Sequence, residues 1–221
     1  MWIAELWRYP VKSMAGEALE TVALTEDGID GDRIVQVRDG RGRVLTARTR
    51  PQLLRHRSML GAGGQPLVDG RPWDAGDVAR DVEKAAGAGA RLVHETGPGR
   101  FDVLPLLIAT DGALQAVGHD RRRFRPNIVI GGVSGLSERE WEGRRLQIGD
   151  VVIGIGDLRQ RCIMTAFDPD TLEQDLGVLR RVQTEFGGFL GLNCFVIRGG
   201  TISAGAPADI SPSPSMADPG R

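Results

Sequence analysis

The chain has 221 residues, enough for one large domain or two small interleaved ones with a real core. Its composition, 41% hydrophobic and 26% charged, is ordinary for a globular protein, and its net charge of −1 excludes a global field that recruits nucleic acid or an anionic membrane. Its two cysteines, Cys162 and Cys194, are too few for a disulfide scaffold, a four-cysteine zinc site or a cysteine-held iron–sulfur cluster.

The chain carries no recognisable signal for export or membrane insertion. It reaches an acid, Glu5, almost at once and lacks a basic region followed by an apolar core, so we expect no signal peptide. No apolar run approaches the length that spans a bilayer, so we expect no membrane partner either. A reducing cytoplasm is the expected setting for a chain with so little sulfur.

Short runs of alternating apolar residues, punctuated by 31 glycines and 12 prolines, dominate the chain. In the first half they predict strands at 2–8, 19–24, 33–39 and 43–47 with a hairpin turn at 38–43, a short helix and strand at 49–59, a small hairpin within 61–73, and a helix within 75–93. Then follow a buried strand and a helix capped near Asp111 (105–118), strands at 126–131, 144–148, 150–155 and 160–166, a helix around 173–185 and a closing hairpin at 193–210. Many strands with non-sequential pairing predict a mainly β fold, a β-barrel with peripheral helices.

Two stretches in the first half suit an anionic ligand. YPVKSMAGE (9–17) places the ammonium of Lys12 beside the hydroxyl of Ser13, and such a group with free backbone amides suits a phosphate. The alternative is a solvated loop that happens to contain a lysine. DGIDGDR (27–33) ends in Arg33, and LTARTRP (45–51) places Arg48 at the end of a strand. An ion pair between Asp32 and Arg33 that pins a turn is the alternative there.

The basic run HDRRRFRPNIVI (119–130) feeds a buried strand. It contains one aromatic residue and lies in a chain of nearly balanced charge, which argues against a nucleic-acid partner. Within it, Pro126 fixes the backbone between the guanidinium of Arg125 and the carboxamide of Asn127. Both side chains can therefore point at one polar ligand.

One cysteine has an unusual neighbourhood. In LRQRCIMTAFDPDT (158–171), Cys162 follows Arg159 and Arg161 and precedes an Asp-Pro-Asp turn. Positive charge stabilises a thiolate, which favours a nucleophile or a metal ligand over an inert core cysteine. Local chemistry does not distinguish nucleophile from ligand.

Six motifs occur in the order seen in MOSC-domain proteins: YPVKS, GIDGDR, TAR..P, RFRPNIV, W.GR.L.IGD and RC..T..DPDT. From about Trp7 to about Gly205 the chain resembles that family, and more closely the mitochondrial amidoxime-reducing component and its bacterial relatives. The resemblance implies an N-terminal β-rich subdomain (1–95) packed on a MOSC-type β-barrel (96–210), with a disordered tail (211–221). It also implies a molybdenum cofactor bound between the two parts.

The resemblance assigns roles to individual residues. Cys162 takes the place of the thiolate ligand of molybdenum. Positions associated with the pterin and its phosphate are held by Lys12, Ser13, Arg33, Arg125 and Asn127, with Arg48 a weaker match. The chemistry agrees, because the phosphate carries roughly two negative charges and a soft thiolate suits a metal already bound to sulfur.

The resemblance also implies a function, and three hypotheses stay open. The first, which the resemblance favours, is a molybdenum oxidoreductase that takes the oxygen from small N-hydroxylated substrates. A chain with too few cysteines for its own cluster would then need a separate electron-donor protein or reductase. The second is a sulfur carrier or transferase with a persulfide on Cys162. The third is a molybdenum-cofactor binding or carrier module without turnover.

Several positions depart from the family pattern. Arg159 stands where relatives often carry another cysteine, and Leu172 stands where they often have glycine. Cys194 takes the place of an aromatic residue, and Ala206 that of the aspartate of VGD. We expect Cys194 to be a small core residue, and we expect Asp168 and Asp170 to form a turn rather than carry protons.

Overall fold

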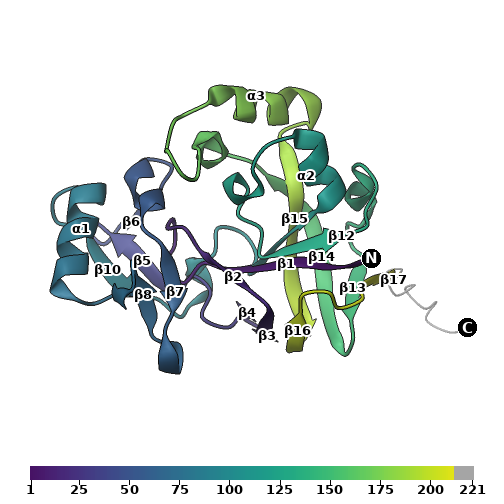
Figure 1. The fold of residues 1–221 in the computed structure, drawn as a ribbon, viewed down its shortest axis with the longest axis horizontal. Helices are drawn as coiled ribbons and strands as arrows, with labels where there is room; N and C mark the ends of the chain where they lie inside the picture. The colour runs from purple at the N-terminus through teal and green to yellow at the C-terminus, as the bar shows by residue number, and fades with distance from the viewer. Residues whose placement is uncertain (212–221) are drawn as a thin grey trace, which may run out of the picture.

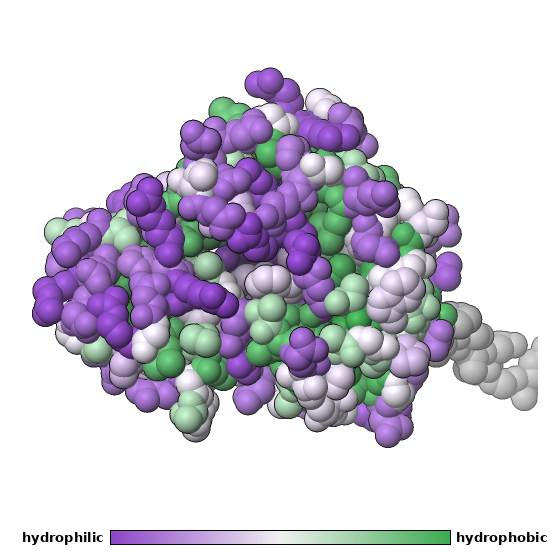
Figure 2. Space-filling model, viewed as in Figure 1, coloured by the Kyte–Doolittle hydropathy of each residue, from purple (hydrophilic) through white to green (hydrophobic). Residues whose placement is uncertain are grey.

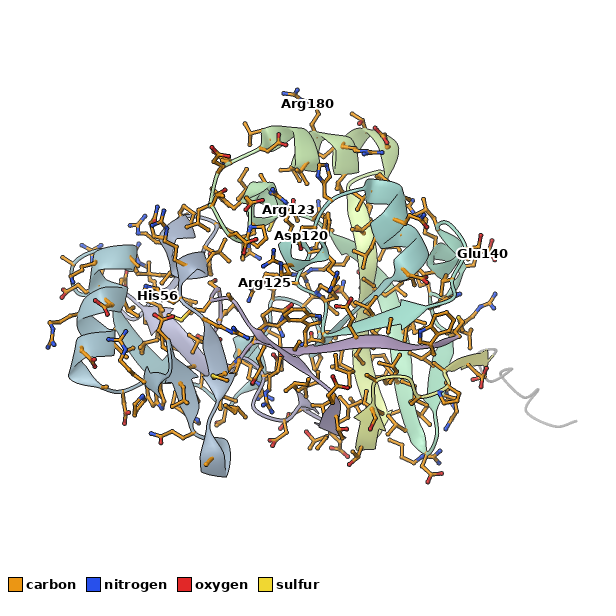
Figure 3. All side chains as sticks on the ribbon, viewed as in Figure 1. His56, Asp120, Arg123, Arg125, Glu140 and Arg180 are labelled. Atoms are coloured by element: carbon orange, nitrogen blue, oxygen red, sulfur yellow. The ribbon has the colours of Figure 1, made fainter. Side chains whose placement is uncertain are left out.

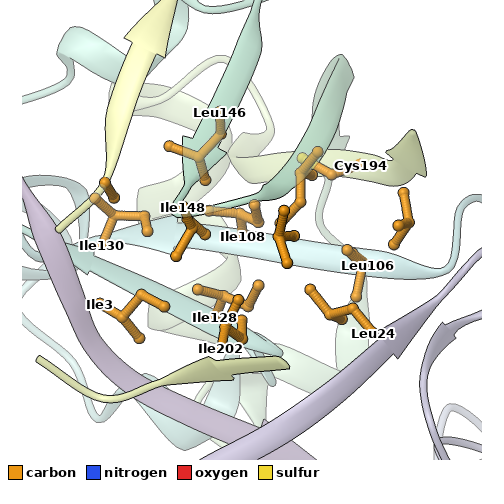
Figure 4. Close-up of a cluster of buried hydrophobic side chains, with 14 of the residues drawn as sticks. Ile3, Leu24, Leu106, Ile108, Ile128, Ile130, Leu146, Ile148, Cys194 and Ile202 are labelled. Carbon is orange, nitrogen blue, oxygen red and sulfur yellow. The ribbon is translucent and has the colours of Figure 1, made fainter. Parts of the chain in front are cut away.

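An eight-stranded sheet takes strands from both halves of the chain. The computed structural model describes residues 1–211. Across this sheet the order is β17 (Asp209–Ser211), β13 (Arg145–Ile148), β14 (Val151–Gln160), β15 (Phe189–Arg198), β11 (Leu106–Thr110), β12 (Ile128–Gly131), β1 (Trp2–Arg8) and β2 (Glu17–Leu19). The β11–β12 pair is parallel, and the other neighbours are antiparallel. Alternate apolar residues of these strands, among them Ile3, Ile108 and Ile130, meet in the main core (Figure 4).

Three smaller sheets complete the β structure. Their orders are β10 (Arg91–His94), β5 (Val35–Arg38), β6 (Val44–Leu45); β7 (Ser58–Leu60), β8 (Pro66–Val68), β9 (Arg71–Pro72); and β16 (Gly200–Ser203), β3 (Thr21–Thr25), β4 (Gly28–Ile29). The first two belong to a separate lobe with its own core, on the left in Figure 1. The third adds Val22, Leu24 and Ile202 to the main core.

Helices lie at the periphery. They are α1 (Gly76–Ala86), α2 (Asp111–Val117) and α3 (Leu176–Glu185), with short 3₁₀ turns η1 (Pro51–Arg55), η2 (Ala62–Gly64), η3 (Pro98–Arg100), η4 (Arg121–Arg123), η5 (Ser137–Glu140) and η6 (Ile163–Ala166). Helix α1 buries Val78, Val82 and Ala86 against the left lobe and ends at Gly87, whose φ of 106° is open to glycine. Helices α2 and α3 share a third core above the large sheet (Figure 1). No helix within residues 1–211 is both long and apolar enough to cross a membrane.

The predicted fold class is confirmed, whereas two local predictions are wrong. The expected strand at 160–166 is the end of β14 followed by η6. The expected hairpin at 193–210 does not form, because β15 pairs with β14 and β11 while β16 pairs with β3. The prediction of a helix cap near Asp111 is confirmed: the cap is the adjacent Thr110, whose hydroxyl accepts from the Ala113 amide, and the Asp111 carboxylate accepts from the Gly132 amide.

The start of the chain is interleaved with its end. Strand β1 lies between β12 and β2, and β3 pairs with β16 through Thr21 and Ser203. The residues before the predicted boundary at 95 therefore contribute to both lobes. The strands before residue 30 pack in the lobe that holds the main core, on the right in Figure 1, and the strands from β5 to β10 build the left lobe. Of the predicted tail, Ser211 ends β17, and 212–221 lie outside the described residues.

Candidate functional site

A cleft opens between the loops that follow β1, β4 and β6 and the end of β14. It encloses about 730 Å³ of space, part of it open to solvent. Six of the seven predicted site residues line it, namely Lys12, Ser13, Arg33, Arg48, Arg125 and Cys162. Figure 3 shows Arg125 where the two lobes meet. Segments far apart in sequence thus bring the predicted phosphate-binding residues and the predicted thiolate to one place.

The cleft is strongly cationic. Seven positively charged side chains line it: Lys12, Arg33, Arg48, Arg123, Arg125, Arg159 and Arg161. Five of them have carboxylate partners: Asp102 for Lys12, Arg48 and Arg159; Asp32 for Arg33; Asp168 for Arg123. Within residues 1–211, Arg125 and Arg161 have no ion pair. The cleft therefore holds positive charge that no protein carboxylate compensates.

The contacts of Arg125 and Arg161 leave this charge available to a ligand. The Arg125 guanidinium lies 4.2 Å from the centre of the Tyr9 ring and makes no hydrogen bond within residues 1–211. Nη2 of Arg161 donates to the Phe124 carbonyl oxygen at 2.6 Å, whereas its buried Nε has no partner among the described residues. Burial lowers the pKa of each guanidinium to about 10. An anion in the cleft would favour the charged forms and offset that burial.

A buried network anchors Arg33 behind the cleft. The fully buried Asp32 carboxylate accepts from the Tyr9 amide at 2.7 Å, accepts from Nδ2 of Asn127 at 3.1 Å and pairs with Arg33. Oδ1 of Asn127 accepts from the Leu107 amide at 3.1 Å and from Arg33 at 3.4 Å. The ion pair between Asp32 and Arg33, which the sequence suggested as an alternative role for Arg33, is thus present in the structure. Asn127, the seventh predicted residue, is fully buried beneath the cleft and joins Arg33 to β11 and β12.

Backbone conformation supports a specialised site. Ser13, Arg33 and Arg125 have φ values of 70°, 56° and 54°, in the left-handed region that side chains other than glycine disfavour. Each such residue costs about 1–2 kcal/mol, and such residues cluster at functional sites. Three of the five non-glycine residues with positive φ in the described chain line this one cleft. The surrounding structure holds their side chains there against local preference.

Asp102 is the one carboxylate among the described residues that line the cleft. It lies on the segment between η3 and β11, 2.9 Å from Nζ of Lys12, 2.5 Å from Arg48 and 3.3 Å from Arg159. Burial opposes its ionisation, but the hydrogen bond and charge of Lys12, with the charges of Arg48 and Arg159, hold its pKa well below the usual range. Asp102 is thus the ion-pair partner of three of the seven cationic groups.

Cys162 lies directly after β14, half-buried at the edge of the cleft. Although burial lowers it, contacts with Cys162 and Asp102 hold the pKa of Arg48 above its ordinary value. Cys162 also borders a shallower hollow that includes the exposed side chains of Val103 and Phe189. Cys162 therefore lines both cavities, unlike the fully buried Cys194.

Two of the departures from the family pattern, Cys194 and Ala206, lie in or against the main core, and a third, Arg159, lies in the cleft. Cys194 is fully buried in the main core, and burial raises the pKa of its thiol, so the prediction of a core residue is confirmed. Ala206 packs against the same core, and its carbonyl accepts from the Ile3 amide at 2.9 Å. Arg159 does reach the cleft, where it donates to Oδ1 of Asn193 at 3.3 Å as well as pairing with Asp102.

Asp168 and Asp170 form the turn expected of them. The Asp168 carboxylate accepts from the backbone amides of Asp170 and Thr171, each at 3.0 Å, and pairs with Arg123. Asp170 pairs with Arg122 on the surface. Neither aspartate lines the cleft. The turn holds Arg123 rather than supplying protons.

The residue after this turn carries a stability prediction. Leu172 has a φ of 61°, a region that glycine occupies without penalty. Leu172→Gly is therefore expected to raise the free energy of unfolding by about 0.5–1 kcal/mol, after allowance for the half-buried side chain it loses. Urea denaturation measures the change. Leu172→Ala is the control, because it removes the side chain but keeps the Cβ, and equal stability of the two variants would contradict the prediction.

Asp102 supports a second prediction. Asp102→Asn removes the partner of three cations and is expected to lower the free energy of unfolding by about 1–2 kcal/mol. Inorganic pyrophosphate should then stabilise the variant more than it stabilises the unmodified chain, because a bound anion adds RT ln(1 + [L]/Kd). Thermal unfolding over a pyrophosphate series measures both effects. Equal pyrophosphate stabilisation of the two proteins would show that Asp102 does not compete for these cations.

Sequence reasoning missed several members of the site. The predicted residues do not include Asp102, Arg123 or Tyr9. Asp102 and Arg123 line the cleft, and the Tyr9 ring packs against Arg125. Asp102 lies in no motif, and its ion-pair partners are at least 54 residues away in sequence. No local pattern therefore indicates that it belongs to the site. For Tyr9 the signal was present, since it begins the YPVKS motif.

Comparisons with known proteins match both halves of the chain to family profiles. The MOSC domain profile matches residues 110–209, and the MOSC N-terminal beta barrel domain profile matches residues 1–96. Mitochondrial amidoxime reducing component 2 of Homo sapiens is 38% identical over 88 residues, which cover 37% of this chain and 24% of that protein. Component 2 of Bos taurus is 27% identical over 227 residues (76% of this chain, 67% of that protein), and component 1 of Homo sapiens is 26% identical over 229 (76% and 67%).

Solved structures with a similar course of the chain include the YuaD protein from Bacillus subtilis and YiiM from Escherichia coli. The first has a TM-score of 0.48 at 14% identity and covers 95% of this chain and 98% of its own. The second has a TM-score of 0.43 at 15% identity and covers 93% and 70%. Because the two domain profiles together account for most of residues 1–209, the chain belongs to the family of MOSC-domain proteins.

Proposed function

We propose that this protein is a molybdenum-cofactor-dependent oxidoreductase that removes oxygen from small N-hydroxylated compounds, with Cys162 as a ligand of the metal. The observation that carries the proposal is the pair Arg125 and Arg161, two uncompensated cations in a cleft that also contains a half-exposed thiol. The similarity to mitochondrial amidoxime-reducing components favours this substrate class. The overall reaction converts R–NH–OH, two electrons and two protons into R–NH₂ and water.

The chemistry of the donor set fits the anionic end of the cofactor. A terminal phosphate carries about two negative charges and three acceptor oxygens. Arg125 and the orphaned Nε of Arg161 supply charge and donors that the protein leaves unused. Ser13 adds a hydroxyl, and Lys12 lies beside it with its charge shared by Asp102. Fork-shaped guanidinium groups bind phosphate oxygens in pairs, so these residues would orient the group as well as attract it.

Asn127 has a supporting part in this proposal. Its amide is fully buried and occupied by Asp32, Leu107 and Arg33. A direct contact with the pterin stays a prediction from the resemblance. The described contacts instead suit a residue that fixes the position of Arg33.

The metal would lie beside Cys162, and when bound the cofactor would supply the oxygen-atom removal itself. The chain's own groups would do the rest. Arg48 and Arg159 would add positive charge beside Cys162, since both line the same cleft. The hollow bordered by Val103 and Phe189 would admit substrate from the solvent side. With two cysteines the chain cannot hold an iron–sulfur relay, so electrons would come from a separate donor protein.

The test is the composition and activity of protein purified from cells with intact cofactor synthesis. We expect about one molybdenum and one pterin per chain, and consumption of benzamidoxime with reduced methyl viologen as the donor. Arg125→Met and Arg161→Met should lower pterin content, whereas Arg80→Met, on an exposed face of α1, should not. Protein that lacks pterin and carries a sulfur adduct on Cys162 would support the sulfur-carrier alternative. Fully loaded protein inactive toward several N-hydroxylated compounds would support the binding-module alternative.

A further inference from the structure

A second groove lies behind the cleft. It encloses about 1530 Å³ of partly open space and is bordered by Trp7 and Tyr9, by η1 and by the turn at 169–171. The Tyr9 ring lies between the two cavities: Tyr9 borders the groove, while Arg33 and Arg125, which line the cleft, lie 5.1 and 4.2 Å from the centre of its ring. This aromatic side chain is therefore part of the wall between an open surface groove and the cationic cleft.

The groove carries unused positive charge of its own. Arg55 and Arg57 border it, are exposed, and have no side-chain hydrogen bond or ion pair within residues 1–211. On the opposite side Arg122 is shared between Asp120 and Asp170. The lining thus holds three arginines and one aspartate, although the whole chain has a net charge of −1. Figure 2 shows hydrophilic side chains gathered over the junction of the lobes on this face.

The geometry points to this groove as the docking site of an acidic electron-donor protein. The inference rests on the proposed function, which needs two electrons per turnover from outside the chain. The hollow beside Cys162 would be occupied by substrate, so a donor that approached there would compete with it. From the groove, electrons would cross one side chain, Tyr9, to reach the cleft. Unpaired cations on the rim would steer an acidic partner to this face.

Charge reversal at the rim tests the inference. The double variant Arg55→Glu and Arg57→Glu is compared with Arg41→Glu and Arg80→Glu, which makes the same change in net charge on exposed positions of the same lobe. Each cofactor-loaded protein is assayed with reduced flavodoxin, an acidic one-electron carrier, and with reduced methyl viologen, a small cationic one. We expect the groove variant to lose about tenfold or more of the second-order rate with flavodoxin at low ionic strength. The loss should shrink at high salt.

The two donors separate the possible failures. Viologen-driven turnover should be alike in all three proteins, because neither arginine pair lines the cleft. If flavodoxin drives the groove variant as well as it drives the control, or does not reduce the unmodified chain while viologen does, the docking site is wrong. If the loaded, unmodified chain shows no turnover with viologen, the proposed function fails instead.

Discussion

Cys162→Ala is expected to abolish oxygen removal from N-hydroxylated substrates, a loss of at least about a hundredfold and the largest effect anticipated for any single substitution. On the proposed function the thiolate is the only protein ligand of the metal. Its neighbours Arg48 and Arg159 would remain in place, because Asp102 holds both. The variant should therefore keep its fold and its affinity for pyrophosphate while losing activity. Turnover is measured with methyl viologen, and stability by thermal unfolding.

Cys194→Ala is the matched control for this prediction. Cys194 is buried in the main core among apolar side chains, so its truncation should cost about 1 kcal/mol of stability through a small cavity and leave turnover intact. Replacement by alanine is thus expected to abolish turnover at Cys162 and to leave turnover intact at Cys194. Full turnover by the Cys162 variant would refute its role as a ligand.

Asp32→Ala is expected to lower the free energy of unfolding by about 3 kcal/mol, the largest stability effect at the site. The substitution leaves Arg33 without its ion-pair partner and removes the acceptor of the Tyr9 amide and of Nδ2 of Asn127. These donors are buried, so each unmade hydrogen bond retains its desolvation cost. Because Arg33 would lose its anchor, affinity for pyrophosphate should fall as well. Denaturant unfolding, with midpoint and slope reported separately, measures the first effect.

Asp170→Ala provides the comparison for the same exchange at an exposed pair. Asp170 meets Arg122 on the surface, where its side chain is 67% exposed, so the loss should stay below about 1 kcal/mol. Comparing the two variants tests whether burial of the carboxylate, rather than the loss of one charge, determines the loss of stability. Equal effects of the two substitutions would mean that the network beneath the cleft contributes no more than a surface ion pair.

Much of this architecture could be predicted because its signals are local. Strand β1 was predicted with the bounds that the structure has, although its register shifts between Ile3 and Glu5 and interrupts the alternation. Lys12, Arg33, Arg125 and Cys162 were recognised from short motifs, and the structure brings them to one cleft. Turn chemistry was readable too, as the contacts of Asp168 confirm.

The rest depended on pairings between distant segments. In residues 193–210 two apolar runs flank adjacent glycines, a pattern typical of a hairpin. In the structure β16 pairs with β3 instead. Asp102 lies in a segment with no periodicity, and its role exists only once three cations from other segments surround it. The sequence predicts that Asn127 can point at the same ligand as Arg125, whereas its burial beneath the cleft follows from packing that no local pattern encodes.

The pairing of β3 with β16 has a consequence for biosynthesis. At ordinary translation rates of 5–20 residues per second, roughly 10 s or more pass between the emergence of Thr21 and that of Ser203 from the ribosome. Until then β3 has only the short strand β4 beside it, which leaves one edge of β3 unpaired and makes the nascent chain a natural client for chaperones. On the proposed function the cofactor would likewise be inserted late, because Cys162 is made long after Lys12.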